Sequence, residues 1–251
     1  VIIRVNFKLT PAEMPIVIKS KYITSSNEFF TGCLNLTIDK APIIPKDKAM
    51  LLAMESLNKN TIGNYNSAIG TNALYNNTTG SNNTAVGYQA LYYNTTASRN
   101  TAVGAYSQHN NTFGYANVSV GNDTLIGNTT GSYNTAIGSR SLQSNTVGIN
   151  NTAVGFQTLY NNTTNYNSAF GYKALFANTT GIHNTAVGHA SLSANTIGER
   201  NTAVGYESLI TNTTGSNNTA VGFQSLYNNT VGNNHAFGYR SLFANTTGSL
   251  N

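Results

Sequence analysis

NTTGSNNTAVGYQALYYNTT (77–96) and NTTGSNNTAVGFQSLYNNT (212–230) are two copies of a unit that recurs from residue 60 to residue 251. Asparagine stands four residues before the glycine that closes the N-T-A-V-G motif in every copy. Alanine stands two before it except at Ser119, and Val, Ile or Phe stands directly before it. The closing glycines are Gly70, Gly87, Gly104, Gly121, Gly138, Gly155, Gly171, Gly188, Gly205, Gly222 and Gly238. Their nearly constant spacing identifies a repeat array of about eleven units.

A second motif, N-T-x-G, lies between successive closing glycines. Its Asn-Thr pair occurs twelve times, and Ala97 and Asn165 stand where the other copies have glycine. Asparagine tolerates a left-handed backbone better than alanine does. We therefore predict a left-handed corner at this slot, to which Asn165 is better suited than Ala97.

The repeat is too rich in glycine and asparagine to be helical. Two glycines in each unit would destabilise a helix, and no apolar stripe with a helical period is present. Each unit instead contains two segments typical of strands, N-T-A-V-G-Y and [AS]-L-[YF]-x-N-T, separated by polar corners. The sequence thus predicts an all-β fold, a parallel β-solenoid or β-roll of about eleven 16–17-residue turns.

Asparagine at fixed corners is expected to form amide ladders between stacked turns, which explains its recurrence in a strand-rich fold. The alanine beside each closing glycine predicts close backbone packing there. The residues assigned to these structural corners are Asn66, Asn83, Asn100, Asn134, Asn151, Asn184, Asn201, Asn218, Gly87, Gly155, Gly205 and Gly222.

Two units are shorter than the others by a single residue, and they share a second departure from the pattern. They end in NYNSAFG (165–171) and GNNHAFG (232–238), and both place phenylalanine, Phe170 or Phe237, directly before the closing glycine. We expect the shorter corner to shift the strand outward and the larger ring to fill the gap. The stretches that follow, GYKALFANTTG (171–181) and GYRSLFANTTG (238–248), are also alike, which suggests a higher-order unit of four turns.

Residues 1–59 differ in composition, because all four prolines and the single cysteine lie there. Alternating apolar residues predict a small β-rich N-terminal domain over residues 1–45. Met50, Leu51, Met54 and Leu57 have helical spacing, so a short helix over 46–59 is expected to cap the array over 60–251. Open solenoid ends expose apolar side chains and unpaired backbone groups, which such caps cover.

Charge and motif content disfavour several classes of function. The five basic residues of 60–251 are scattered, so no nucleic-acid partner is predicted. The chain lacks a run of about 20 apolar residues, so no membrane insertion is expected. The four histidines fall in different slots and are interpreted as drift on an outer face. No catalytic set, metal site or cofactor is predicted, and the chain is not expected to be an enzyme.

Each unit supplies more apolar side chains than a narrow coil can enclose. We expect the Val/Ile/Phe and Leu columns to be buried and the aromatic columns to remain partly exposed. A continuous aromatic face indicates an interaction surface, which cyclic self-association would cover. The predicted assembly is a homotrimer, and the candidate oligomer or ligand face comprises Tyr88, Tyr92, Phe156, Tyr160, Tyr206, Phe223 and Tyr227.

The stretches 77–96 and 212–230 resemble the repeats of phage and large-virus tail-fibre proteins. They are similar, more loosely, to the head repeats of bacterial trimeric autotransporter adhesins, whose turns are shorter. This resemblance implies a trimeric fibre or adhesin segment, extracellular on a virion or cell surface. Its expected partners are itself and neighbouring fibre or particle proteins, with surface glycans as candidate ligands.

An ice-binding solenoid is the alternative function. Seven of the eleven first motifs hold threonine directly after the asparagine, and an outward threonine array at strand spacing could order water. The threonines are Thr84, Thr101, Thr135, Thr152, Thr185, Thr202 and Thr219. The bulky aromatic residues and the two shortened units argue against the flat surface that such a function needs.

Overall fold

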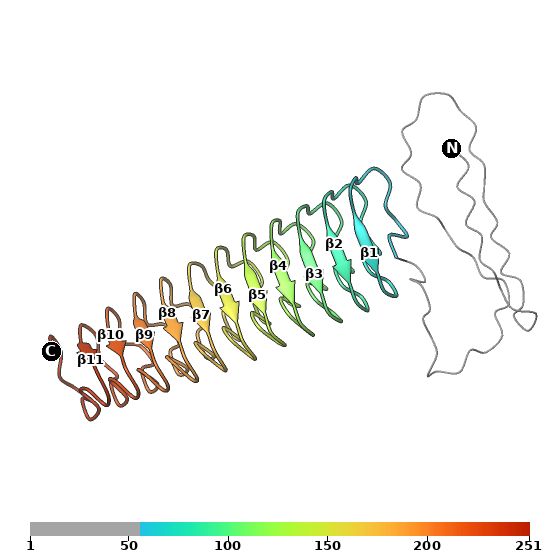
Figure 1. Cartoon of the computed structure of the whole chain (residues 1–251). Coiled ribbons are helices and arrows are strands. Elements are labelled where there is room, and N and C mark those ends of the chain that lie inside the picture. The colour runs from blue at the N-terminus through green and yellow to red at the C-terminus, as the bar shows by residue number, and fades with distance from the viewer. Residues whose placement is uncertain (1–55) are drawn as a thin grey trace, which may run out of the picture. The chain divides into compact units, whose positions relative to one another are not determined.

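The computed structural model describes residues 56–251, which contain strands and turns but no helix. Eleven parallel strands lie in one sheet in sequence order (Figure 1). They are β1 (Ser67–Ile69), β2 (Thr84–Val86), β3 (Thr101–Val103), β4 (Val118–Val120), β5 (Thr135–Ile137), β6 (Thr152–Val154), β7 (Ser168–Phe170), β8 (Thr185–Val187), β9 (Thr202–Val204), β10 (Thr219–Val221) and β11 (His235–Phe237). Equivalent residues of successive repeats pair, as Ala85 does with Ala102. The predicted parallel β-solenoid is confirmed.

Each coil, meaning one turn of the solenoid, contains one strand and not the two that the sequence predicts. The stretch that leads from the closing glycine into the [AS]-L-[YF]-x-N-T segment is left-handed at its second and fourth residues after that glycine, as at Gln89 (φ 53°) and Leu91 (φ 52°). Its amides therefore alternate in direction. Gln89 N donates to Thr71 O of the preceding coil, and Leu91 N donates to Ser107 O of the following coil, both at 3.0 Å. The segment is thus bonded to both neighbours without strand geometry.

The closing glycine occupies a backbone conformation that other residues rarely adopt. Gly205 has φ +132°, and a Cβ there would lie 2.7 Å from the carbonyl carbon of Gly222 in the next coil. Both the conformation and the close approach require glycine. This confirms the predicted close packing of backbone at this corner.

Glycine is required in the N-T-x-G corner because a side chain there would collide with its neighbours. The prediction of a left-handed backbone at this slot was wrong. The φ of Gly80 lies outside the left-handed region. A Cβ on Gly80 would lie 2.5 Å from Asn77 Oδ1 and 3.0 Å from Asn94 Nδ2. Glycine at this slot therefore leaves room for the asparagine side chains that stack beside it.

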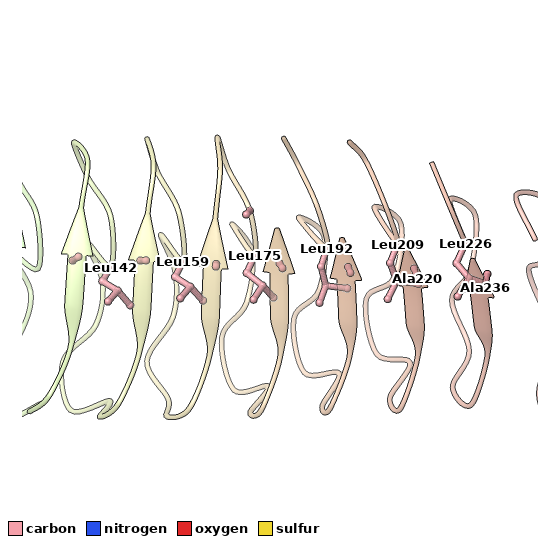
Figure 2. Close-up of a cluster of buried hydrophobic side chains, with 14 of the residues drawn as sticks. Leu142, Leu159, Leu175, Leu192, Leu209, Ala220, Leu226 and Ala236 are labelled. Atoms are coloured by element: carbon pink, nitrogen blue, oxygen red, sulfur yellow. The ribbon is translucent and has the colours of Figure 1, made fainter. Parts of the chain in front are cut away.

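The core consists of an alanine column and a leucine column. The central residue of each strand and the fourth residue after each closing glycine point inward, as Ala220 and Leu226 do (Figure 2). The prediction that the Val/Ile/Phe column is buried was wrong. A strand alternates its side chains between faces, so an inward alanine places the residue that follows it outside.

Two asparagine ladders confirm the predicted amide stacking. In the first ladder, four residues before each closing glycine, the backbone amide of Asn201 donates to Asn184 Oδ1 at 3.0 Å. Asn201 Nδ2 donates to Gly215 O at 2.8 Å and so ties the strand to the N-T-x-G corner. In the second ladder, formed by the N-T-x-G asparagines, Asn195 Nδ2 donates to Asn178 Oδ1 at 2.8 Å. Because these groups are buried, each bond also prevents an unsatisfied polar atom.

The structure places the twelve residues assigned to structural corners in two sets. The eight asparagines, Asn66, Asn83, Asn100, Asn134, Asn151, Asn184, Asn201 and Asn218, belong to the first ladder. The four glycines, Gly87, Gly155, Gly205 and Gly222, are closing glycines with positive φ.

The two shortened coils interrupt the second ladder. Asn162 Nδ2 turns to Thr164 O at 2.9 Å, and the buried Oδ1 of Asn145 has no hydrogen-bond partner. Asn165 was predicted to occupy the glycine slot, but it does not. The Thr164 carbonyl accepts the hydrogen bond that the glycine carbonyl accepts in other coils. Asn165 Oδ1 instead accepts from Ile149 N at 2.7 Å. The deletion therefore removes one corner residue and breaks the ladder.

The phenylalanines of the shortened coils do not fill an interior gap, contrary to prediction. Phe170 is 41% exposed and Phe237 is 69% exposed, because both belong to the outward column directly before the closing glycine. The predicted N-terminal domain (1–45) and the predicted cap up to residue 55 lie outside the described residues. Residues 56–59 form a turn and not the end of the expected helix, with Leu57 left-handed at φ 52°.

Candidate interaction surface

The outward face of the sheet carries two columns of side chains. The first strand residue is Thr in seven strands, and the third is always Val, Ile or Phe. These third residues are half-buried or exposed in every coil, as Val187 and Ile137 are. The third column therefore forms a continuous apolar surface over all eleven strands, and we call it the apolar column.

A column of aromatic rings lies beside the apolar column, on the residues that follow the closing glycines. In six successive coils these residues stack face to face with centroids 4.9–5.8 Å apart and planes within 14° of parallel. The members of this stack, the first ring column, are Phe156, Tyr172, His189, Tyr206, Phe223 and Tyr239. The interpretation of His189 as drift is corrected, because it fills a ring position between two tyrosines.

A second ring column lies five residues after each closing glycine and is discontinuous. Tyr75, Tyr92 and His109 stack in the first coils, so His109 is also a ring of a column. Two separate pairs, Tyr160–Phe176 and Tyr227–Phe243, follow, and each spans one of the two shortened coils. Each pair has a cation over its phenylalanine. Lys173 Nζ is 5.4 Å from the Phe176 centroid, and the Arg240 guanidinium carbon is 3.9 Å from that of Phe243.

The structure places six of the seven predicted face residues in these two columns. Phe156, Tyr206 and Phe223 belong to the first stack, and Tyr160 and Tyr227 belong to separate pairs of the second column. Tyr92 stacks on His109, while Tyr88 meets Tyr106 edge-on. The six residues therefore form two stripes of rings and not one face, and Tyr88 belongs to neither.

The sequence interpretation missed the apolar column and three members of the first ring column. The apolar column carries only the weak alternation signal of the three-residue T-A-V strand, in which the central residue points inward. Alignment of the repeats on the closing glycine would have placed Tyr172, His189 and Tyr239 in the slot of Phe156.

Stacking limits the chemistry available to the first ring column. Inside the stack, each ring covers the face of its neighbour, so outside partners meet ring edges. The residue before Phe156 in this column is Ser139, so one face of Phe156 is not covered by a ring of the column. A partner that packs against a ring face would therefore meet the stack at this end.

Charged groups are sparse on this surface. Asp123 and Arg140 in adjacent coils form an ion pair at 3.7 Å, and Glu199 pairs with its neighbour Arg200 at 3.2 Å. A hydrogen bond to the Glu207 carboxylate and its negative charge raise the pKa of the Tyr206 phenol. Within residues 56–251, His, Cys, Asp and Glu form no group of three able to hold a metal ion. The same residues contain no helix that could cross a membrane.

Comparison with known proteins gives no family: no protein-family model, curated protein or solved structure matches this chain.

Proposed function

We propose that residues 60–251 form a structural fibre or adhesin segment whose chains associate side by side through the apolar column. The supporting observation is the continuity of that column, which leaves Val, Ile or Phe outside on every strand. Large contiguous apolar surfaces on soluble chains mark interaction sites. Cyclic association, as a homotrimer, covers equivalent columns of all chains along one axis.

The setting that suits such a rod is the outer surface of a virion or cell. Neighbouring fibre or particle proteins would contact its ends. Surface glycans are candidate ligands, and the Phe156 end of the first ring column offers them a ring face. The resemblance of the repeats to tail-fibre proteins supports the same setting.

Placing charges on the apolar column tests this proposal. In the full chain, Val154→Lys, Val204→Lys and Val221→Lys together place three cations on the proposed interface. The matched control places lysine at Thr79, Thr130 and Thr214 on the corners, away from the strands. Sedimentation velocity should give a smaller particle for the valine variant and an unchanged one for the control. Equal association of both proteins would contradict the proposal.

Ice binding is the second candidate function, and one observation favours it. The seven predicted threonines all lie on the outward face of a parallel sheet in strict register, as Thr185 opposite Thr202 shows. Four strands interrupt the array with Ser67, Val118, Ser168 and His235. A thermal-hysteresis assay on the full chain separates the functions, because the fibre proposal expects no activity.

A further inference from the structure

The coil after Gly104 departs from the repeat at two inward positions. Gln108 stands in the leucine column and Ser119 in the alanine column, and both are fully buried. Gln108 Nε2 donates to Ser119 Oγ at 2.8 Å and to Thr101 O at 3.0 Å. Ser107 Oγ also contacts Ser119 Oγ, while Gln108 Oε1 has no partner. These residues form a polar layer that interrupts the leucine and alanine columns of the core.

The apolar core of the described residues is divided at this layer. One buried cluster runs from Ala73 to Ala102, and a second runs from Leu125 to Ala236. Stability in solenoids is close to a sum of repeat terms and nearest-neighbour contacts. Replacing a Leu–Ala contact by a partly satisfied polar contact therefore weakens one interface and leaves the others unchanged.

Hydrogen bonding at the N-T-x-G corner is also weak where this coil meets the preceding one. In a regular corner, the amides of Thr112, Phe113 and Gly114 donate to Thr129 O at 2.9–3.3 Å. In the preceding corner, where alanine replaces glycine at Ala97, the amides of residues 95–97 donate to no backbone carbonyl of the described chain. The ladder bond from Asn111 Nδ2 to Asn94 Oδ1 is lengthened to 3.4 Å, against 2.7 Å from Asn94 to Asn77.

The corner at 230–232, beside the last coil, lacks these amide bonds, as do the corners before the two shortened coils, at residues 146–148 and 213–215. The core nevertheless passes both without interruption, because the second cluster includes the leucines on either side of each. Among the described coils, the interface between the coil that ends at Gly104 and the coil that follows it is therefore the one inside the array at which both core and corner bonding are weak.

We infer that this interface is a built-in joint that divides the array into two cooperative units, residues 57–102 and residues 125–236. The shorter unit opens and recloses while the longer one stays folded. In a rod, neighbouring coils separate at such a joint before they separate at the remaining interfaces. The inference depends on the fold alone and holds whether or not the chain is a fibre.

Hydrogen exchange of the full chain, followed by mass spectrometry, tests the inference. Peptides from 57–102 should exchange together, at least about tenfold faster than those from 125–236, with a step at the joint. Fraying of an ordinary solenoid end would instead give rates that fall gradually from coil to coil. A gradual profile would overturn the inference.

Two variants locate the cause of the step. Gln108→Leu with Ser119→Ala restores the repeat and should remove the step, leaving only gradual fraying. Leu192→Gln with Ala203→Ser rebuilds the polar layer five coils later, because Ser191 precedes Leu192 as Ser107 precedes Gln108. It should create a new step after Gly188. A step that stays in the first variant, or none in the second while circular dichroism shows it folded, would refute the joint.

Discussion

At the scale of the residue, left-handed backbone is the main requirement of this fold. Three non-glycine residues per coil are left-handed, including leucines of the core such as Leu91 and Leu209. Each costs about 1 kcal/mol or more, and hydrogen bonds to neighbouring coils must offset that cost. The sequence shows where glycine is required, but it gives no sign of left-handed leucines, because propensity disfavours them. This is why the second predicted strand does not form.

The closing glycines should tolerate no side chain. Gly205→Ala forces a Cβ onto a residue with φ +132° and against the Gly222 carbonyl, so we expect a loss of about 2–4 kcal/mol in unfolding free energy. Urea denaturation measures the loss. Thr214→Ala, at an exposed corner, is the control and should change stability by less than about 0.5 kcal/mol. Equal effects would contradict the assigned backbone.

The Tyr206 phenol should titrate above its ordinary value of about 10, since its pKa is raised by Glu207. A folded-state pKa above the unfolded one stabilises the protein at neutral pH, and this contribution is lost as the pH rises past the folded pKa. Glu207→Gln should lower the Tyr206 pKa. Carbon NMR of labelled tyrosine, followed with pH, reports this directly; an unchanged midpoint would refute the hydrogen bond.

At the scale of the element, the asparagine ladders and the strand alternation decide what each coil can tolerate. The fixed asparagines predicted the ladders correctly, because a buried amide needs partners at a constant position. The assignment of the core was less successful. An apolar residue recurs at both the Val/Ile/Phe and the Leu position of the repeat. Only the short strand, whose central alanines such as Ala220 point inward, shows that Leu is buried and Val is not. A strand this short gives a weak alternation signal.

Truncation within the first ladder should be costly. Asn201→Ala removes a donor to Gly215 O and an acceptor for Asn218 N, and it leaves buried groups unpaired. We expect a loss of about 2–4 kcal/mol in unfolding free energy. Asn251→Ala, at the exposed end of the same ladder, should cost less than about 1 kcal/mol. Similar losses for both variants, measured by urea denaturation, would show that burial does not determine how much each ladder asparagine contributes to the unfolding free energy.

Leucine and valine truncations should separate the inward and outward columns. Leu209→Ala opens a cavity in the core and should cost about 2–5 kcal/mol under all conditions. Val204→Ala should cost less than about 1 kcal/mol in dilute protein and more at high concentration, because its column is covered only on association. Thermal unfolding across a dilution series measures both. A concentration-independent loss at Val204 would contradict the proposed interface.

At the scale of the whole molecule, the repeat period was enough to predict a parallel solenoid, and the excess of apolar residues was enough to predict an exposed face. The identity of that face could not be predicted from composition, since it depends on which residues point outward. The structure gives two ring stripes and an apolar column along the strands. The apolar column, which sequence interpretation placed in the core, is the surface on which the proposed association depends.

The mass of the full chain in solution tests that association most directly. Sedimentation equilibrium should give three chains, about 80 kDa or three times the 26.7 kDa of one chain, at micromolar concentration. The particle should dissociate in the apolar-column variant and persist in the corner control. A stable, soluble monomer of 26.7 kDa at the same concentration would contradict the account.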